Sequence, residues 1–185
     1  AATGKFDTSA IGSFSGGITS VMILANANST GFYYNDTAAG TPTLTAASIG
    51  LTSGTQVETV NAAAASKIVF TTTAQTINAG APSLVMTIQT QDTYNNPAPA
   101  NVTGITIVNL TSNSTNGVFA TSSGGPFTIT TVTIPANANS ASFFYKDAVT
   151  GTPTLTAASG TLTSATQPET IAAAVASKIV FTTSA

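Results

Sequence analysis

The stretch GTPTLTAAS at residues 40–48 is repeated without change at residues 151–159, which is 151 − 40 = 111 positions further along the chain. The same spacing holds over a long flanking region. Between residues 18–74 and 129–185, about two-thirds of the positions are identical without a gap, which indicates a repeat architecture. We therefore interpret the chain as a piece of a tandem array.

A repeat of this length is about the size of a small β-sandwich. With a unit boundary at residue 65, the sequence divides into three parts. We expect residues 1–64 to be the C-terminal part of one repeat, residues 65–175 to be a complete repeat, and residues 176–185 to be the first strand of the next repeat.

The complete repeat is predicted to be all-β. Short runs of β-branched and aromatic residues alternate with Gly, Pro, Asn and Ser turns, which is typical of a β-sandwich. The expected strands are residues 66–72, 83–92, 104–110, 118–121, 127–134, 140–145, 154–158 and 162–166. Residues 76–82 are expected to be a turn, and the Ala-rich runs 62–65 and 172–176 to be linkers.

Alternation along two of these strands predicts which side chains face the core. In residues 83–92, Leu84, Met86 and Ile88 are expected to face inward. In residues 140–145, Phe143 and Tyr145 are expected in the core and Phe144 outside.

The low charge excludes several classes of function. The chain has four basic residues and six acidic ones, and its charged fraction of 5% compares with about 25% in typical proteins. Because nucleic-acid and polybasic membrane sites need clustered Lys and Arg, neither is expected. Apolar residues make up 42% of the chain but occur in short runs, so direct membrane insertion is not expected either.

The sequence also lacks the usual catalytic groups, because it contains no His and no Cys. This excludes Ser-His-Asp and Cys-His catalysis and His-based metal sites. We predict no catalytic residue, no cofactor and no enzymatic activity. Oxygen atoms of Asp92, Asn95 and Asn96 are the weak candidates for a calcium site, but an Asx turn is the favoured interpretation of that loop.

Lys67 and Lys178 occupy the same place in the first strand of two units, and Glu58 and Glu169 lie shortly before them. We interpret these residues as weak surface ion pairs at the junctions between units, worth under about 1 kcal/mol. A Lys-Asn cross-link, of the kind found in some surface pilin domains, is the alternative.

The abundance of Thr, Ser and Asn favours an extracellular or cell-surface location. Glycosylation is predicted at five Asn-X-Ser/Thr sequons, at Asn28, Asn35, Asn101, Asn109 and Asn113. Glycans, or burial in an assembly, would keep a surface with so few charges in solution.

Residues 1–64 lack a counterpart of residues 65–111, so a sandwich built from them would expose edges that invite pairing with another chain. The matching inter-unit strand is predicted at Ser177, Lys178, Ile179, Val180 and Phe181. Residues 1–64 and 176–185 supply 64 + 10 = 74 of 111 positions. Either strand donation completes a smaller sheet, or the sequence is a window of a longer polypeptide, which we favour.

Two segments resemble a known family. SLVMTIQTQD followed by TYNNP resembles the signature of bacterial Ig-like repeats of the invasin and intimin type. VTIPANANSASFFYKD followed by GTPTLTAASGTLTSATQPETI is similar to the second half of tandem Ig-like repeats in large prokaryotic surface proteins. Asn95 stands where the family usually has Gly. The resemblance implies Ig-like sandwiches strung in series, without catalytic residues.

The resulting hypothesis is a non-enzymatic structural repeat of a cell-surface filament or adhesin shaft. Its expected partners are copies of itself or neighbouring repeats of the same chain, joined by end-to-end stacking and, as one option, by strand donation. Two alternatives stay open: a glycan-binding or host-binding adhesion module, and an accessory domain of a secreted hydrolase.

Overall fold

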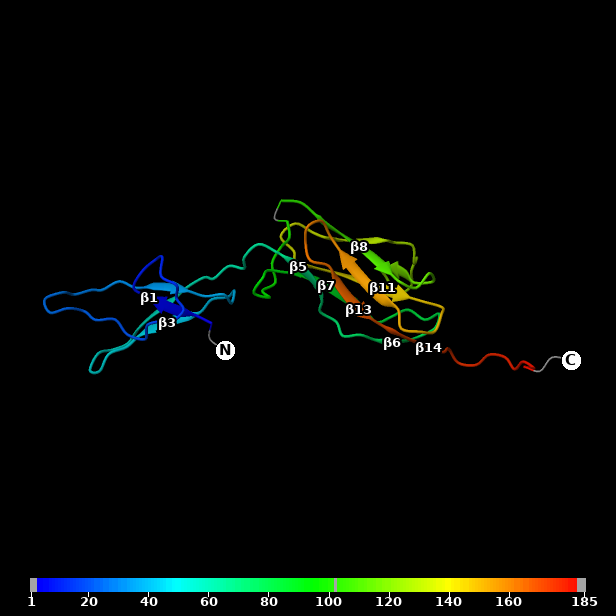
Figure 1. The fold of residues 1–185 in the computed structure, drawn as a ribbon, viewed down its shortest axis with the longest axis horizontal. Coiled ribbons are helices and arrows are strands. Elements are labelled where there is room, and N and C mark those ends of the chain that lie inside the picture. The colour runs from blue at the N-terminus through cyan, green and yellow to red at the C-terminus, as the bar shows by residue number, and fades with distance from the viewer. Residues whose placement is uncertain (1–2, 102, 183–185) are drawn as a thin grey trace. The chain divides into compact units, whose positions relative to one another are not determined.

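The computed structural model describes residues 3–101 and 103–182, which form strands and no helix. The chain divides into two compact units, unit 1 (Ala1–Ala63) and unit 2 (Ala64–Ala185), each with its own strands (Figure 1). The predicted all-β class is confirmed. No helix in the described part of the chain is long and apolar enough to cross a membrane.

Unit 2 is a sandwich of two four-stranded sheets, with strand orders β10-β8-β12-β13 and β5-β7-β11-β9. A parallel pair, β6 with β14, is added to these sheets. The strands are β5 (Lys67–Phe70), β6 (Thr76–Asn78), β7 (Met86–Gln91), β8 (Thr106–Ser112), β9 (Val118–Ala120), β10 (Thr131–Ile134), β11 (Ser140–Lys146), β12 (Thr154–Ala158), β13 (Ala165–Pro168) and β14 (Thr170–Ala172).

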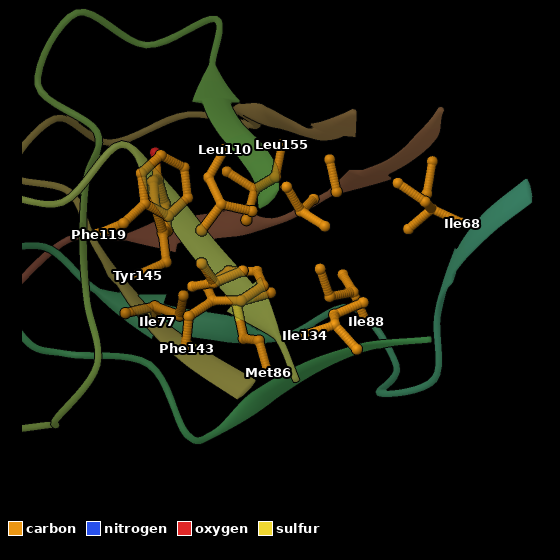
Figure 2. Packing of buried hydrophobic residues seen from close by; sticks show 14 of the residues in the cluster. Ile68, Ile77, Met86, Ile88, Leu110, Phe119, Ile134, Phe143, Tyr145 and Leu155 are labelled. Carbon is orange, nitrogen blue, oxygen red and sulfur yellow. The ribbon is translucent and has the colours of Figure 1, made fainter. Parts of the chain in front are cut away.

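The core of unit 2 lies between its two sheets. Figure 2 shows Leu110 and Leu155 from one sheet meeting Met86 and Phe143 from the other. Alternation along the strands produces this arrangement, because successive side chains point to opposite faces. Phe143 and Tyr145 are fully buried on β11, as predicted, while Phe144 between them is half-buried on the outer face.

The structure corrects the prediction around residues 76–86. Residues 76–78, predicted as part of a turn, form β6, which pairs with β14 in a region assigned partly to a linker. Leu84, predicted to face inward, is 78% exposed because Ser83 takes the inner position. Ser83 exchanges two hydrogen bonds with the Tyr145 backbone: its N–H donates to the Tyr145 carbonyl at 2.8 Å, and its hydroxyl accepts the Tyr145 N–H at 2.9 Å.

Several strand limits also differ from those predicted. β7 begins three residues later than residue 83, and β8 and β13 are shifted towards the C-terminus relative to residues 104–110 and 162–166. In residues 127–134 only the last four form a strand, β10. A cis Gly125-Pro126 bond precedes that segment, and Ile129 makes an isolated bridge to Phe119.

Unit 1 contains two separate hairpin-like pairs. These are β1 (Lys5–Asp7) with β2 (Tyr33–Asn35), and β3 (Thr43–Ala46) with β4 (Gly54–Val57). Strands equivalent to β5–β8 are not among the described residues of this unit. The segment at residues 20–23, equivalent to β10, forms no strand there, because β10 pairs with β8.

Candidate assembly surface

The two units share the same local hydrogen bonds at equivalent positions. In unit 2 the Tyr145 hydroxyl donates to Asp147 Oδ2 at 2.8 Å, and in unit 1 the Tyr34 hydroxyl donates to Asp36 Oδ2 at 2.6 Å. The backbone N–H two residues after each Asp donates to its other carboxylate oxygen, at 2.9 Å in both units. This Tyr-Asp motif therefore forms in unit 1 without the strands β5–β8.

The loop that follows the motif is also conserved in geometry between the units. Gly151 and Ile171 form an antiparallel bridge in unit 2, and Gly40 and Val60 form the same bridge in unit 1. Both glycines have φ near 150°, at 152° and 155°, a region that residues with a side chain rarely adopt. The repeated GTPTLTAAS stretch thus begins at the same backbone turn in each unit.

Hydrogen bonding shifts the pKa of each carboxyl in the Tyr-Asp motif. Donation from the Thr3 and Tyr34 hydroxyls and the Ala38 N–H lowers the pKa of Asp36 to about 2. Burial opposes ionisation of Asp147, but donors from Val149, Ser114 and Tyr145 outweigh it and lower its pKa. Both carboxylates are therefore acceptors that hold the turn in place, and neither is poised to transfer a proton at neutral pH.

Burial, in contrast, differs sharply between equivalent residues. Phe143 is 0% exposed and its equivalent Phe32 is 42% exposed. Ile134 is 0% exposed and its equivalent Ile23 is 54% exposed. We name the core-equivalent residues of unit 1 the open face; they are Val21, Ile23, Phe32, Tyr34 and Leu44.

In unit 2 the same positions are covered in part by β5. Ile68 on β5 is 3% exposed, and the ring of Phe70 meets Phe143 edge-on with centroids 6.3 Å apart. β5 also reaches the opposite sheet near β13, where the Ile68 N–H donates to the Thr163 carbonyl at 2.8 Å and the Thr163 N–H donates to the Ser66 carbonyl at 2.9 Å. β5 therefore joins the two sheets at one edge of the sandwich.

The predicted inter-unit strand has the sequence of β5 but not its surroundings. Ser177, Lys178, Ile179, Val180 and Phe181 repeat residues 66–70 without change and form no strand. Ile179 is 101% exposed and Phe181 is 99% exposed, whereas Ile68 is buried. We name residues 177–181 the tail segment.

The candidate calcium loop is closed by hydrogen bonds within the chain. Asp92 is fully buried and accepts from the Tyr94 N–H at 2.8 Å, the Asn96 N–H at 2.9 Å and Asn96 Nδ2 at 2.8 Å. This is an Asx-type turn. Among the described residues, no group of three or more His, Cys, Asp or Glu residues could hold a metal ion.

Asn95 in the same loop is notable for its backbone conformation and for a hydrogen bond with Lys67. Its φ is 73°, in the left-handed region, where Asn is tolerated better than most residues other than Gly. Its side-chain oxygen accepts a hydrogen bond from Lys67 Nζ.

Glu169, interpreted from the sequence as one partner of a surface ion pair, is only 1% exposed. Its carboxylate accepts the Gln75 N–H at 2.5 Å, at the start of β6, and Gln167 Nε2 at 2.7 Å. Burial raises its pKa. The surface interpretation of Glu169 is therefore wrong, and this residue ties β6 to the end of the unit. The sequence carries one signal of this role, the shared Gln-X-Glu spacing in both repeats.

The predicted glycosylation sites lie on the surface, with one exception. Asn28, Asn35, Asn109 and Asn113 are exposed, whereas Asn101 is half-buried. The Asn101 side-chain oxygen accepts the N–H groups of Thr103 and Gly104, each at 3.0 Å. Asn113 uses its side-chain oxygen to accept the Thr154 N–H at 2.8 Å, which leaves its amide nitrogen available.

One surface hollow of unit 2 is lined by no titratable side chain. It has a volume of about 420 Å³ and lies in unit 2 between the loop that leads into β8 and the β12–β13 turn. Its lining residues are Ala100, Asn101, Ile105, Thr106, Ile107, Ser159, Gly160, Thr161 and Leu162. The hollow therefore offers no acid, base or nucleophile beyond hydroxyl groups.

No protein-family model matches the chain, and the search of curated proteins found no match. Among solved structures, the chain is similar to domains 4 and 5 of the S-layer protein SbsC, with 19% identity and a TM-score of 0.41 over 75% of this chain and 60% of that one. It is also similar to a glycosyl hydrolase family 2 member from Bacteroides cellulosilyticus, with 16% identity and a TM-score of 0.48.

A β-glycosidase from Bacteroides vulgatus gives 13% identity and a TM-score of 0.48. In each of the two hydrolase comparisons the matched region spans 76% of this chain but only 18% of the hydrolase. It thus spans 60% of the SbsC fragment and a small part of each hydrolase.

Proposed function

We propose that this chain is a non-enzymatic, extracellular structural repeat of a cell-surface filament or adhesin shaft, built by β-sandwiches placed end to end. The observation that carries the proposal is the internal repeat. Two segments 111 positions apart share their sequence and also the Tyr-Asp motif, the Gly bridge and the β3–β4 pairing, which has the register of β12–β13. Two segments this similar to each other suit a role in which each unit does the same task as its neighbour.

The chemistry of the described residues favours a mechanical role. The buried carboxylates Asp92, Asp147 and Glu169 are each engaged by donors that hold a turn or a strand. The exposed surface is rich in Thr, Ser and Asn, which suits contact with water or with glycans. The resemblance to invasin-type and intimin-type repeats supports the same role.

The proposal is tested on material from the native source. Antibodies raised against unit 2 are expected to label filaments or surface projections of intact cells in electron microscopy. The mass of the denatured protein would be measured on the same material, and a value above 18.3 kDa in steps of one repeat would indicate a shaft made by one long polypeptide. Labelling confined to lysed cells, or release of the antigen with a hydrolase activity, would contradict a structural surface role.

A further inference from the structure

Two segments far apart in the sequence of unit 2 lie side by side and run in the same direction. β6 follows the first strand of the unit, and β14 is its last strand. They form a parallel pair with Ile77 opposite Ile171 (Figure 1). Each of the other pairs of named strands in the described part of the chain is antiparallel.

Hydrogen bonds hold both ends of the β6–β14 pair. The Thr170 N–H donates to the Gln75 carbonyl at 2.9 Å, and the Ala79 N–H donates to the Ala172 carbonyl at 2.8 Å. Glu169, which is buried just before β14, accepts the Gln75 N–H at 2.5 Å. The side chain of Glu169 therefore adds a bond where the pair begins.

The β6–β14 pair is also anchored to the rest of unit 2. Ile77 and Ile171 are each 3% exposed and belong to the core. On the other edge of β14, the Ile171 N–H donates to the Gly151 carbonyl at 2.8 Å, and the Gly151 N–H donates to the Ile171 carbonyl at 3.1 Å. Just after β6, the Gly80 N–H donates to the Asp147 carbonyl at 2.7 Å.

The parallel direction decides how tension along the chain reaches these bonds. The chain enters unit 2 before β5 and leaves it after β14, at opposite ends of the unit (Figure 1). A pull on both ends therefore draws β6 towards its N-terminal end and β14 towards its C-terminal end. Because the strands are parallel and their bonds evenly spaced, the strands slide past each other, and the bonds share the load instead of breaking one after another.

β5 makes a contact of the same kind closer to the point where the chain enters the unit. Lys67 and Thr163 form a parallel bridge. The Ile68 N–H donates to the Thr163 carbonyl at 2.8 Å, and the Thr163 N–H donates to the Ser66 carbonyl at 2.9 Å. Both of the first two strands are thus held in parallel by segments close to the end of the unit.

We propose that the β6–β14 pair, together with Glu169, is a mechanical clamp that resists unfolding of unit 2 when the two ends of the unit are pulled apart. This role deepens the proposed function and rests on it, because a shaft on a cell surface is pulled along its chain. The clamp sets the rate of forced unfolding, which is a quantity separate from the equilibrium free energy of unfolding.

Pulling single molecules in two directions tests the clamp. The natural chain contains no cysteine, so handles attach only where one is introduced. The first variant of the 185-residue chain carries Ala64→Cys and Ala174→Cys, at exposed positions on either side of the strands of unit 2. Unit 1 lies outside the two handles and is not stretched. The 174 − 64 = 110 positions between the handles give the length increase that identifies unfolding of unit 2.

The matched control moves only one handle, from Ala64 to Asn78. Asn78 is exposed at the C-terminal end of β6, opposite Ala172. Asn78→Cys with Ala174→Cys therefore pulls both strands at the same end and peels them apart. The first variant is expected to unfold at a force at least about twofold higher than the control at the same pulling speed. Equal forces in the two directions, or a lower force in the first, would overturn the clamp.

A second measurement separates the clamp from the stability of the core. Ile171→Ala and Ile134→Ala remove the same atoms from buried positions, on β14 and on β10. Each variant is pulled through the handles at positions 64 and 174, and urea unfolding gives its loss of equilibrium free energy. For the same loss, Ile171→Ala is expected to lower the unfolding force at least about twice as much as Ile134→Ala.

If Ile134→Ala lowers the force as much, the core as a whole resists the pull, and the clamp is overturned. The comparison of the two directions uses substitutions at exposed positions only, so it decides the matter even where Ile171→Ala does not fold.

Failure of the clamp and failure of the proposed function are distinguishable. An unfolding force that does not depend on direction removes the clamp and leaves the surface labelling of intact cells as it is. Labelling confined to lysed cells contradicts the surface role, whereas the direction of pulling is tested on the purified chain in either case.

Discussion

The second half of unit 2 and unit 1 are about two-thirds identical over residues 129–185 and 18–74 and share the Tyr-Asp motif and the same two-stranded pairing, but they differ in burial. Phe143 and Phe32 occupy equivalent positions, but Phe143 is fully buried whereas Phe32 is 42% exposed. The difference shows which parts of the fold depend only on nearby residues in the sequence. Turns and hairpins form from the residues within them, whereas a core requires a second sheet to close over the first.

Removal of an aromatic ring at the equivalent positions 143 and 32 should give the largest difference in lost stability between the two units. Phe143→Ala takes away a fully buried ring that contacts Phe70 and Phe119, and such changes cost about 3–5 kcal/mol. Phe32→Ala removes a ring that is 42% exposed and should cost about 1 kcal/mol. Urea unfolding, with hydrogen exchange of each unit followed by mass spectrometry, measures both. Similar losses of stability in the two variants would mean that Phe32 is packed as tightly in unit 1 as Phe143 is in unit 2.

Loss of the motif hydroxyl should have an intermediate effect. Tyr145→Phe removes the donor to Asp147 and the 3.0 Å contact with the Ser112 hydroxyl, and leaves a buried carboxylate with one donor fewer. We expect a cost of about 1–3 kcal/mol to unit 2. Tyr34→Phe removes a bond in a half-buried setting, where water replaces the lost donor, so its cost should be smaller. Thermal melts of both variants at neutral pH provide the comparison, and a larger loss for Tyr34→Phe would contradict it.

The smallest expected effect concerns the pH dependence of unit 2. Burial raises the pKa of Glu169 above its ordinary value of 4.5, so the folded state holds this proton more tightly than the unfolded state. Its contribution to stability is therefore present below about pH 4.5 and is lost as the pH rises through the folded-state pKa. Glu169→Gln should flatten the fall in the free energy of unfolding above pH 4.5.

The matched control for this prediction is Glu58→Gln, at the equivalent position of unit 1. There the carboxylate has Gln56 as a partner, and the described residues of the unit include no strand equivalent to β6. This variant should leave the pH dependence of unit 2 unchanged. An unchanged slope in Glu169→Gln would show that Glu169 is not the group that titrates.

Several elements could be predicted from residue order because their signals are local. β12 has the limits expected from GTPTLTAAS, and Phe143, Tyr145, Met86 and Ile88 face the core as alternation requires. The pairing of β6 with β14 could not be predicted in this way. Gln75 and Glu169 are 94 positions apart, and a parallel pair leaves no periodic pattern that links its two strands.

Leu84 shows a second limit of local patterns. Its spacing from Met86 and Ile88 suits a strand with one inner face, but the hydrogen bonds between Ser83 and Tyr145 shift the alternation by one residue before β7 begins. A small polar residue is thereby buried and a large apolar one exposed. Only the partner strand, β11, decides this outcome.

The sequence by itself determined the repeat, the all-β class and the lack of the residues used in common catalytic sites, because these depend on residue identity and short spacing. The tertiary structure decided which of two related copies is buried. Burial depends on a facing sheet, and a repeated segment meets different neighbours at its two positions in the chain. That is why SKIVF is a core strand at residues 66–70 and an exposed segment at residues 177–181.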